Sequence, residues 1–119
     1  MYSERLLEHF QNPRNVGELD DADIRAEVSN PICGDILRVT ATVAAGRIGR
    51  IAYQSRGCTA SIAAGSALTE LLLGRTAEEA LRLSRDDVEE AVGGLSNESK
   101  HAAVLAIDGV KALVAGWPA

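Results

Sequence analysis

Two stretches of alternating apolar and polar residues constrain the fold of this chain more than any other feature. Residues 36–43 alternate with the period of a strand that has one buried face. Residues 47–55 repeat the pattern after a short connection, Ala45-Gly46. Such a connection predicts an antiparallel hairpin, in which Gly49 can form a bulge.

The residues before the hairpin predict a third strand, a helix and a loop. Residues 24–28 are a weaker strand candidate, so three consecutive strands form a meander. A helix is predicted over residues 2–10, with Ser3 as its cap. Its apolar face is expected to consist of Leu6, Leu7 and Phe10. Residues 11–23, with their Asn, Pro, Gly and Asp, predict an ordered loop that links the helix to the sheet.

After the strands the pattern changes to helical spacing. Residues 58–74 are rich in Ala, Ser and Gly, which predicts a helix that packs closely against its neighbours. Thr76 and Ser84 are hydroxyl residues followed by acidic residues, so each is expected to cap a short helix. Asn97 or Ser99 is expected to cap a final, apolar helix.

Strands first and helices afterwards predict an α+β fold, a three-stranded antiparallel sheet with helices packed on it. The chain has 119 residues, of which 46% are apolar, which is typical of one domain over residues 1–119. At this length, folding buries roughly two thirds of the unfolded surface without disulfides. The two cysteines are therefore available for other chemistry.

Charge and hydropathy exclude two classes of partner. The net charge is −5 and there is no basic block, which argues against nucleic acid. The longest apolar run, residues 102–107, is far shorter than the roughly 18 residues of a membrane span. The first residues lack the features of a signal peptide. We therefore expect a cytoplasmic protein with reduced thiols.

The first candidate site residues lie in the segment Asn30-Pro31-Ile32-Cys33-Gly34-Asp35. A thiol in a turn is followed two residues later by a carboxylate, and Gly34 allows Cys33 and Asp35 to face the same point. Taken alone, the segment is better explained as a turn cysteine beside an aspartate that caps a backbone amide.

The second thiol, Cys58, lies where the third strand meets the helix that follows it. The amides at a helix N-terminus favour a thiolate, the form that binds metals, and Arg56 adds positive charge. Antiparallel pairing places the start of the second strand beside the end of the third, so Cys33 and Cys58 should converge. The alternatives are two buried small side chains or an adventitious disulfide.

His101 is expected in the first turn of the last helix. Together with Cys33, Asp35 and Cys58 it would complete a set of two sulfurs, one oxygen and one nitrogen that suits zinc or iron. The alternative is a polar surface histidine. His9 has no partner in the sequence and receives no role. The sequence contains no nucleophile elbow, phosphate loop or C-x-x-C pair, so an enzyme is not predicted.

Four segments, in order, resemble the iron-sulfur cluster scaffold family of the NifU N-terminal domain and IscU type. They are YSERLLEHFQNPRNVGELD, NPICGDIL, RGCTASIAAGSALTELLLG and KHAAVLAIDGVKAL, and together they cover nearly the whole chain. The resemblance implies a three-stranded antiparallel sheet with helices packed against it. It also implies transient binding of iron, a nascent 2Fe-2S cluster or zinc at one exposed end.

The resemblance assigns roles to the residues that match the family pattern. Cys33 and Cys58 match two cysteine ligands, Asp35 matches the aspartate that keeps the cluster labile, and His101 matches the histidine beside a third cysteine. That third cysteine is replaced by Ala102, which can neither accept sulfur nor hold iron.

The partners implied by the resemblance are a cysteine desulfurase, which donates sulfur, and iron-sulfur acceptor proteins. Residues 95–100 lack the proline-rich motif that recruits a dedicated ATP-driven chaperone, so no such dependence is expected. A homo-oligomer, in which a second copy supplies thiols, is also compatible with the sequence.

The presence of alanine at position 102 leaves three interpretations of the function open. The chain is either a working scaffold that holds a cluster or iron through Cys33, Asp35, Cys58 and His101, or a degenerate member that binds zinc there and regulates the desulfurase. The third interpretation is an ordinary scaffold whose third cysteine has been replaced.

Overall fold

The alternating segments form a three-stranded antiparallel meander. A computed structural model of the chain describes residues 2–31 and 34–118. The strands are β1 (Ile24–Asn30), β2 (Asp35–Ala44) and β3 (Arg47–Arg56), in the order β1-β2-β3. The predicted sheet and its order are confirmed.

The connection between β2 and β3 is as tight as predicted. Ala45 and Gly46 have φ values of 53° and 75°, as the two-residue turn of a twisted hairpin requires. The pairing register shifts between Thr42 and Val43, which leaves Gly49 outside the ladder. The predicted bulge at Gly49 is confirmed, and it turns Ile48 into the core, where only 2% of this residue is exposed.

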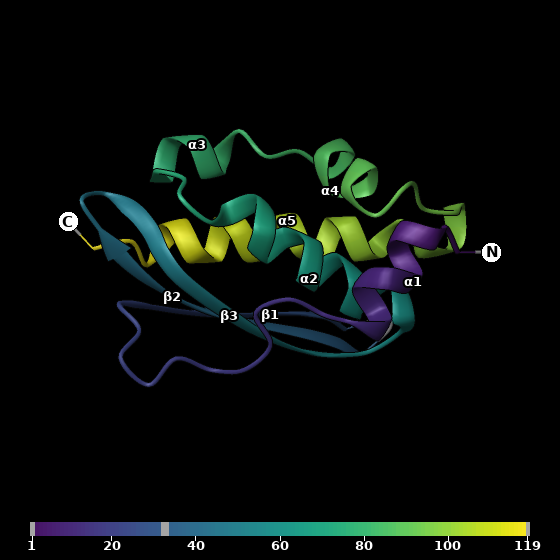
Figure 1. Ribbon diagram of the computed structural model, residues 1–119, viewed down its shortest axis with the longest axis horizontal. Coiled ribbons are helices and arrows are strands. Elements are labelled where there is room, and N and C mark those ends of the chain that lie inside the picture. Colours follow the sequence, from purple (N-terminus) through teal and green to yellow (C-terminus); the bar gives the residue numbers. More distant parts are fainter. Residues whose placement is uncertain (1, 32–33, 119) are drawn as a thin grey trace.

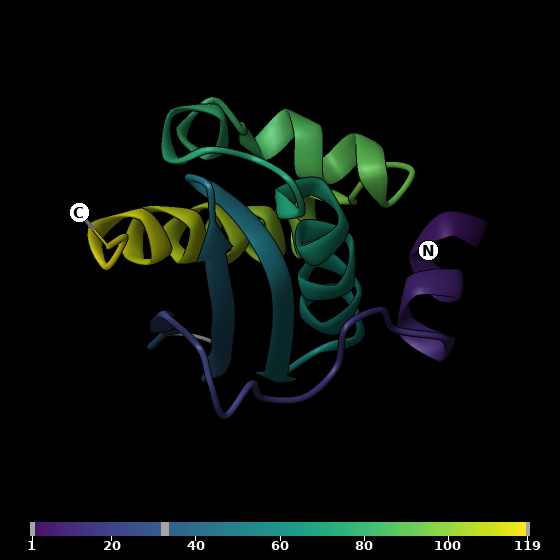
Figure 2. The same ribbon diagram turned by 60° about the vertical axis from the view of Figure 1, so that its left-hand side comes forward.

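Helices cover one face of the sheet in two layers (Figures 1 and 2). The inner layer consists of α2 (Thr59–Leu72) and α5 (His101–Ala115), and the core lies between these helices and the strands. The outer layer consists of α3 (Ala77–Leu81) and α4 (Arg85–Ala91). The predicted α+β architecture is therefore confirmed.

Small residues let both inner helices approach the sheet closely. A Cβ atom added at Gly65 of α2 would lie 2.6 Å from the ring of Tyr53. One added at Gly109 of α5 would lie 2.9 Å from the side chain of Leu37. The close packing predicted from the Ala-, Ser- and Gly-rich helix is confirmed, and it brings the ends of α2 and α5 against the strand ends.

Three of the predicted helix caps are present. Ser3 caps α1 (Glu4–Gln11), and Thr76 and Ser84 cap α3 and α4; each hydroxyl accepts a hydrogen bond from an amide in the first turn. Thr76 and Ser84 also form capping boxes with acidic residues three positions later. These caps start the short helices that cover α2 and α5.

The predicted cap of the final helix is wrong. Asn97–Ser99 form a short 3₁₀ turn, η1, and Lys100 enters α5 with helical angles of φ −62° and ψ −22°. Because the chain is already helical here, neither Asn97 nor Ser99 has the extended conformation of a capping residue.

No helix in the described part of the chain is long and apolar enough to cross a bilayer.

The buried face of α1 also differs from the prediction. Leu6 is 1% exposed, but Leu7 and Phe10 are each 37% exposed. His9 shares the buried side with Leu6, because residues three apart lie on one face of a helix. The helix packs against α2 through this face, and the other apolar residues remain at the surface.

The segment between α1 and β1 is a loop, as predicted, and it runs along the sheet on the side away from the helices (Figure 1). The amide of Leu19 donates to Oγ1 of Thr40 at 3.0 Å. Tyr53 of β3 donates its amide to the carbonyl of Asn15 at 2.8 Å and accepts from the amide of Gly17 at 2.9 Å. The loop is therefore fixed both to β2, at Thr40, and to the outer edge of β3, at Tyr53.

Candidate metal centre

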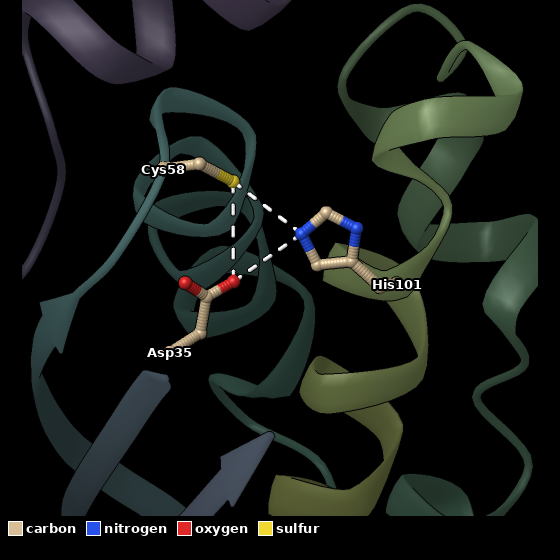
Figure 3. Close-up of side chains that lie close together, drawn as sticks. All are labelled: Asp35, Cys58 and His101. Carbon is tan, nitrogen blue, oxygen red and sulfur yellow. Dashed lines mark hydrogen bonds and ion pairs between the residues drawn. The ribbon is translucent and has the colours of Figure 1, made fainter. Parts of the chain in front are cut away.

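Three of the four predicted site residues meet at one end of the sheet (Figure 3). Asp35 begins β2, Cys58 is the residue before the first turn of α2, and His101 begins α5. Ile36 pairs with Arg56, which places the start of β2 beside the end of β3. The predicted meeting of these strand ends is confirmed, and it brings Asp35 beside Cys58.

The three donor atoms are spaced as the ligands of a single ion. Sγ of Cys58 lies 3.5 Å from Nε2 of His101 and 3.9 Å from Oδ2 of Asp35, and Nε2 lies 3.3 Å from Oδ2. Zinc bonds of about 2.0 to 2.3 Å in tetrahedral geometry separate the ligand atoms by about 3.3 to 3.6 Å. One metal ion can therefore contact all three atoms with little movement.

The tautomer of the neutral His101 ring is set by the backbone. Nδ1 of the ring lies 3.0 Å from the carbonyl oxygen of Glu98 in η1, and a carbonyl can only accept a hydrogen bond. The proton of the neutral ring is therefore on Nδ1, and the lone pair of Nε2 faces Cys58 and Asp35. Metal-binding histidines are oriented in this way by a partner on their other nitrogen.

Burial differs among the three residues. Asp35 is 2% exposed, and Cys58 and His101 are half-buried at the surface. A Cβ atom at Gly57, where φ is +151°, would lie 2.2 Å from Oδ1 of Asp35. Glycine at this position therefore leaves the space that the carboxylate fills, and the site opens to solvent on the side of the thiol and the imidazole.

The start of α2 adds positive electrostatic potential beside Sγ of Cys58. Cys58 has extended angles of φ −76° and ψ 166°, so it stands just before the first turn. The first amides of a helix have no partner within the helix, and the helix dipole is positive at this end. Both effects place positive potential where Sγ of Cys58 lies.

The comparisons with known proteins agree with this architecture. The family model described as the NifU-like N-terminal domain matches residues 1–119. The iron-sulfur cluster assembly scaffold protein IscU 1 of Archaeoglobus fulgidus is 44% identical over 98% of this chain and 76% of its own length. The chain belongs to the NifU-like N-terminal domain family.

Two further proteins extend the comparison. The scaffold protein IscU of Aquifex aeolicus is 38% identical over 90% of this chain and 69% of its own length. The crystal structure of the N-terminal part of a NifU-like protein from Brucella abortus superposes with a TM-score of 0.74 at 21% identity, over 96% of this chain and 92% of the other. The similarity to the Brucella structure shows a shared fold. The Aquifex relative, like the Archaeoglobus one, is named a scaffold protein and not an enzyme.

Cys33 and Ala102 are two further positions to which the resemblance assigns a role. Cys33 lies outside the described residues, so its convergence with Cys58 and its role as a ligand stay predictions. Ala102, where the resemblance places a third cysteine, is 1% exposed and follows His101 in the first turn of α5. Its methyl group offers no donor atom, so the described donors are Asp35, Cys58 and His101.

His9, which received no role from the sequence, is buried at the contact between α1 and α2. Its Nδ1 lies 2.8 Å from Oγ of Ser66, and its Nε2 lies 3.6 Å from Oε1 of Glu70. Burial of the ring, followed by the positive charge of Arg14, lowers the pKa of His9 below 6.5. No local pattern indicates this contact, because Ser66 is 57 positions away.

Proposed function

We propose that this protein is a scaffold for iron-sulfur cluster assembly. In this proposal iron or a nascent 2Fe-2S cluster is held by Cys33, Asp35, Cys58 and His101, and passes on to acceptor proteins. The observation that supports it most is the convergence of a thiol, an imidazole and a carboxylate at metal-ligand spacing in a NifU-like domain. The cluster is cargo, so the site has to bind it and also release it.

The chemistry of the donors suits a cargo that leaves. The thiolate of Cys58 is a soft ligand for iron, and the imidazole of His101 is a ligand of intermediate softness. The carboxylate of Asp35 is a hard ligand that prefers harder ions, so its bond to cluster iron is the weakest of the three. Mixed cysteine and histidine ligation of 2Fe-2S clusters is known chemistry.

The sulfur of the cluster comes, in this proposal, from a cysteine desulfurase. Access favours such a donor, because Cys58 and His101 are half-buried rather than enclosed. With Ala102 in place of a thiol, Cys33 and Cys58 are the two cysteines that can take part. No dependence on a dedicated ATP-driven chaperone is proposed, since the proline-rich motif is absent from residues 95–100.

A second candidate function is zinc binding by a degenerate member that regulates the desulfurase. It is favoured by the spacing of the donor atoms, which suits one tetrahedral ion with little movement. It is also favoured by Ala102, because a chain with fewer thiols holds a two-iron cluster less tightly than one with three.

Anaerobic reconstitution separates the two functions. The full chain is incubated with iron, cysteine, a cysteine desulfurase and a thiol reductant that converts persulfide sulfur to sulfide, then desalted and examined by visible absorption and by iron, sulfide and zinc analysis. A scaffold gives a brown protein with iron and sulfide in equal amounts, and Cys58→Ala, the matched control, stays colourless. A colourless wild-type chain that retains zinc contradicts cluster assembly and supports the second function.

A further inference from the structure

A fourth side chain, Ser61, joins the three that converge at the candidate metal centre. Its hydroxyl donates a hydrogen bond of 2.6 Å to Oδ2 of Asp35, and its Oγ lies 3.4 Å from Sγ of Cys58. Ser61 is the third residue of α2 and is 3% exposed. Its hydrogen bond therefore lies in the protected interior of the site.

The oxygen that accepts this bond is also the oxygen that faces the other two donors. Oδ2 of Asp35 lies 3.3 Å from Nε2 of His101 and 3.9 Å from Sγ of Cys58. A carboxylate oxygen has two lone pairs, so it can accept from Ser61 with one and bind an ion with the other. The hydroxyl and an ion are therefore compatible at the same oxygen.

The other oxygen of Asp35 lies against the backbone of Gly57. Oδ1 fills the space beside Gly57 that a Cβ atom would occupy. Rotation of the carboxylate is therefore limited on one side by the backbone and on the other by the bond from Ser61. With the hydroxyl removed, Oδ2 loses its shortest contact among the described residues and keeps the longer ones to Nε2 of His101 and Sγ of Cys58.

We propose that Ser61 is a positioning residue of the metal centre, which keeps Oδ2 of Asp35 turned toward the position that an ion shares with Cys58 and His101. This inference deepens the proposed function and rests on it. Partners that orient a metal ligand without touching the metal commonly contribute a factor of about 10 to 100 in affinity. We expect a contribution of this size from Ser61.

A purely structural role makes a different prediction. The bond from Ser61 joins α2 to the first residue of β2 across 26 positions of sequence, so it could serve only to satisfy a buried carboxylate. In that case its loss lowers the stability of the metal-free fold and leaves metal affinity unchanged. A positioning role lowers the affinity of a chain that remains folded.

The test is an anaerobic cobalt(II) titration of the full chain and two variants. Ser61→Ala removes the hydroxyl, and alanine is a better helix former than serine, so α2 is retained. Thr59→Ala is the matched control: Thr59 is half-buried in the same turn, and its hydroxyl forms no hydrogen bond with the residues that the structure describes. Urea unfolding of the same samples without metal monitors the fold.

We expect the dissociation constant for cobalt to rise by about 10- to 100-fold in Ser61→Ala and to stay unchanged in Thr59→Ala. At saturation, Ser61→Ala should keep the thiolate-to-cobalt absorption band of Cys58, and its d–d bands should change because the oxygen ligand is no longer held in place. A loss of stability alone does not alter the d–d bands of the saturated, folded protein.

The other outcomes are distinguishable. Unchanged affinity and d–d bands in Ser61→Ala overturn the positioning role and leave the metal centre intact. Weaker binding that accompanies an unfolded metal-free variant assigns Ser61 a structural role and also overturns the proposal. A wild-type chain with no thiolate-to-cobalt band overturns the metal centre itself, and the role of Ser61 with it.

Discussion

Two polar clusters beside helix α2 contain the same kinds of residue, but only one of them has a histidine nitrogen that faces other metal-binding atoms. Each contains a histidine, a serine of α2 and a carboxylate: Asp35, Ser61 and His101 in one, and His9, Ser66 and Glu70 in the other. In the His9 cluster the histidine is 8% exposed and both of its ring nitrogens face side chains of α2. That cluster joins α1 to α2, and both ring nitrogens of His9 have partners within it.

At His101 one ring nitrogen is hydrogen-bonded to the backbone, and the other is available to a ligand. The carbonyl of Glu98 accepts from Nδ1, and Nε2 faces a thiol and a carboxylate. A histidine beside a carboxylate is therefore not sufficient for a metal site. The useful signals are a backbone partner on one nitrogen and a soft donor within ligand distance of the other.

The largest expected effect is a loss of metal affinity on replacing His101, a loss that replacing His9 should not cause. In His101→Ala the ion loses a direct ligand, so the affinity for zinc or cobalt should fall by more than the factor of about 100 that marks the upper range for indirect partners. Competition with a chromophoric chelator measures the affinity. If His101→Ala binds as tightly as the wild type, then Asp35, Cys58 and groups other than this ring form the site.

The converse variant, His9→Ala, should affect stability instead. It leaves the buried hydroxyl of Ser66 without its imidazole partner and opens a cavity between α1 and α2. We expect the free energy of unfolding to fall by about 1 to 3 kcal/mol. Urea unfolding measures this loss, and zinc affinity should match the wild type. A chain with normal stability and weakened zinc binding would contradict the division of roles between the clusters.

The smallest effect is a pH dependence that belongs to the His9 cluster. The pKa of His9 is lowered in the fold, so the unfolded chain binds a proton more readily at this residue. Its contribution to stability is complete above about pH 6.5 and is lost as the pH falls through the lowered value. Urea unfolding at several pH values should show a smaller acid destabilisation in His9→Gln than in the wild type. Equal slopes in the two proteins would assign the acid sensitivity to other groups.

The parts of the fold that follow from local pattern were predictable. Alternation and a two-residue connection predict β2, β3 and the bulge at Gly49, because side-chain direction in a strand depends on neighbouring residues alone. The convergence of Asp35 and Cys58 follows from the geometry of antiparallel pairing. The ligand roles of these residues, and of Cys33, are not tested by the fold and stay predictions.

The contacts between distant segments were not predictable in the same way. His9 meets Ser66 across 57 positions, and neither residue lies in a pattern that indicates the other. Ser61 is one of several small residues at the start of α2, and only its distance to Asp35 distinguishes it. The entry into α5 was missed because a 3₁₀ turn that continues into a helix makes a side-chain cap unnecessary.

The two edges of the sheet differ in a way that limits how copies of this chain can associate. The outer edge of β3 is bonded to Asn15 and Gly17 at Tyr53, and Ile48 is bonded to the segment that follows α2. Among the described residues β1 pairs with β2 alone. Growth of the sheet by an added strand is therefore obstructed on the β3 side at these two positions. In two copies paired through β1, the remaining edge of each sheet would be β3, which is obstructed at Tyr53 and Ile48, and this obstruction disfavours continued strand addition into a fibre.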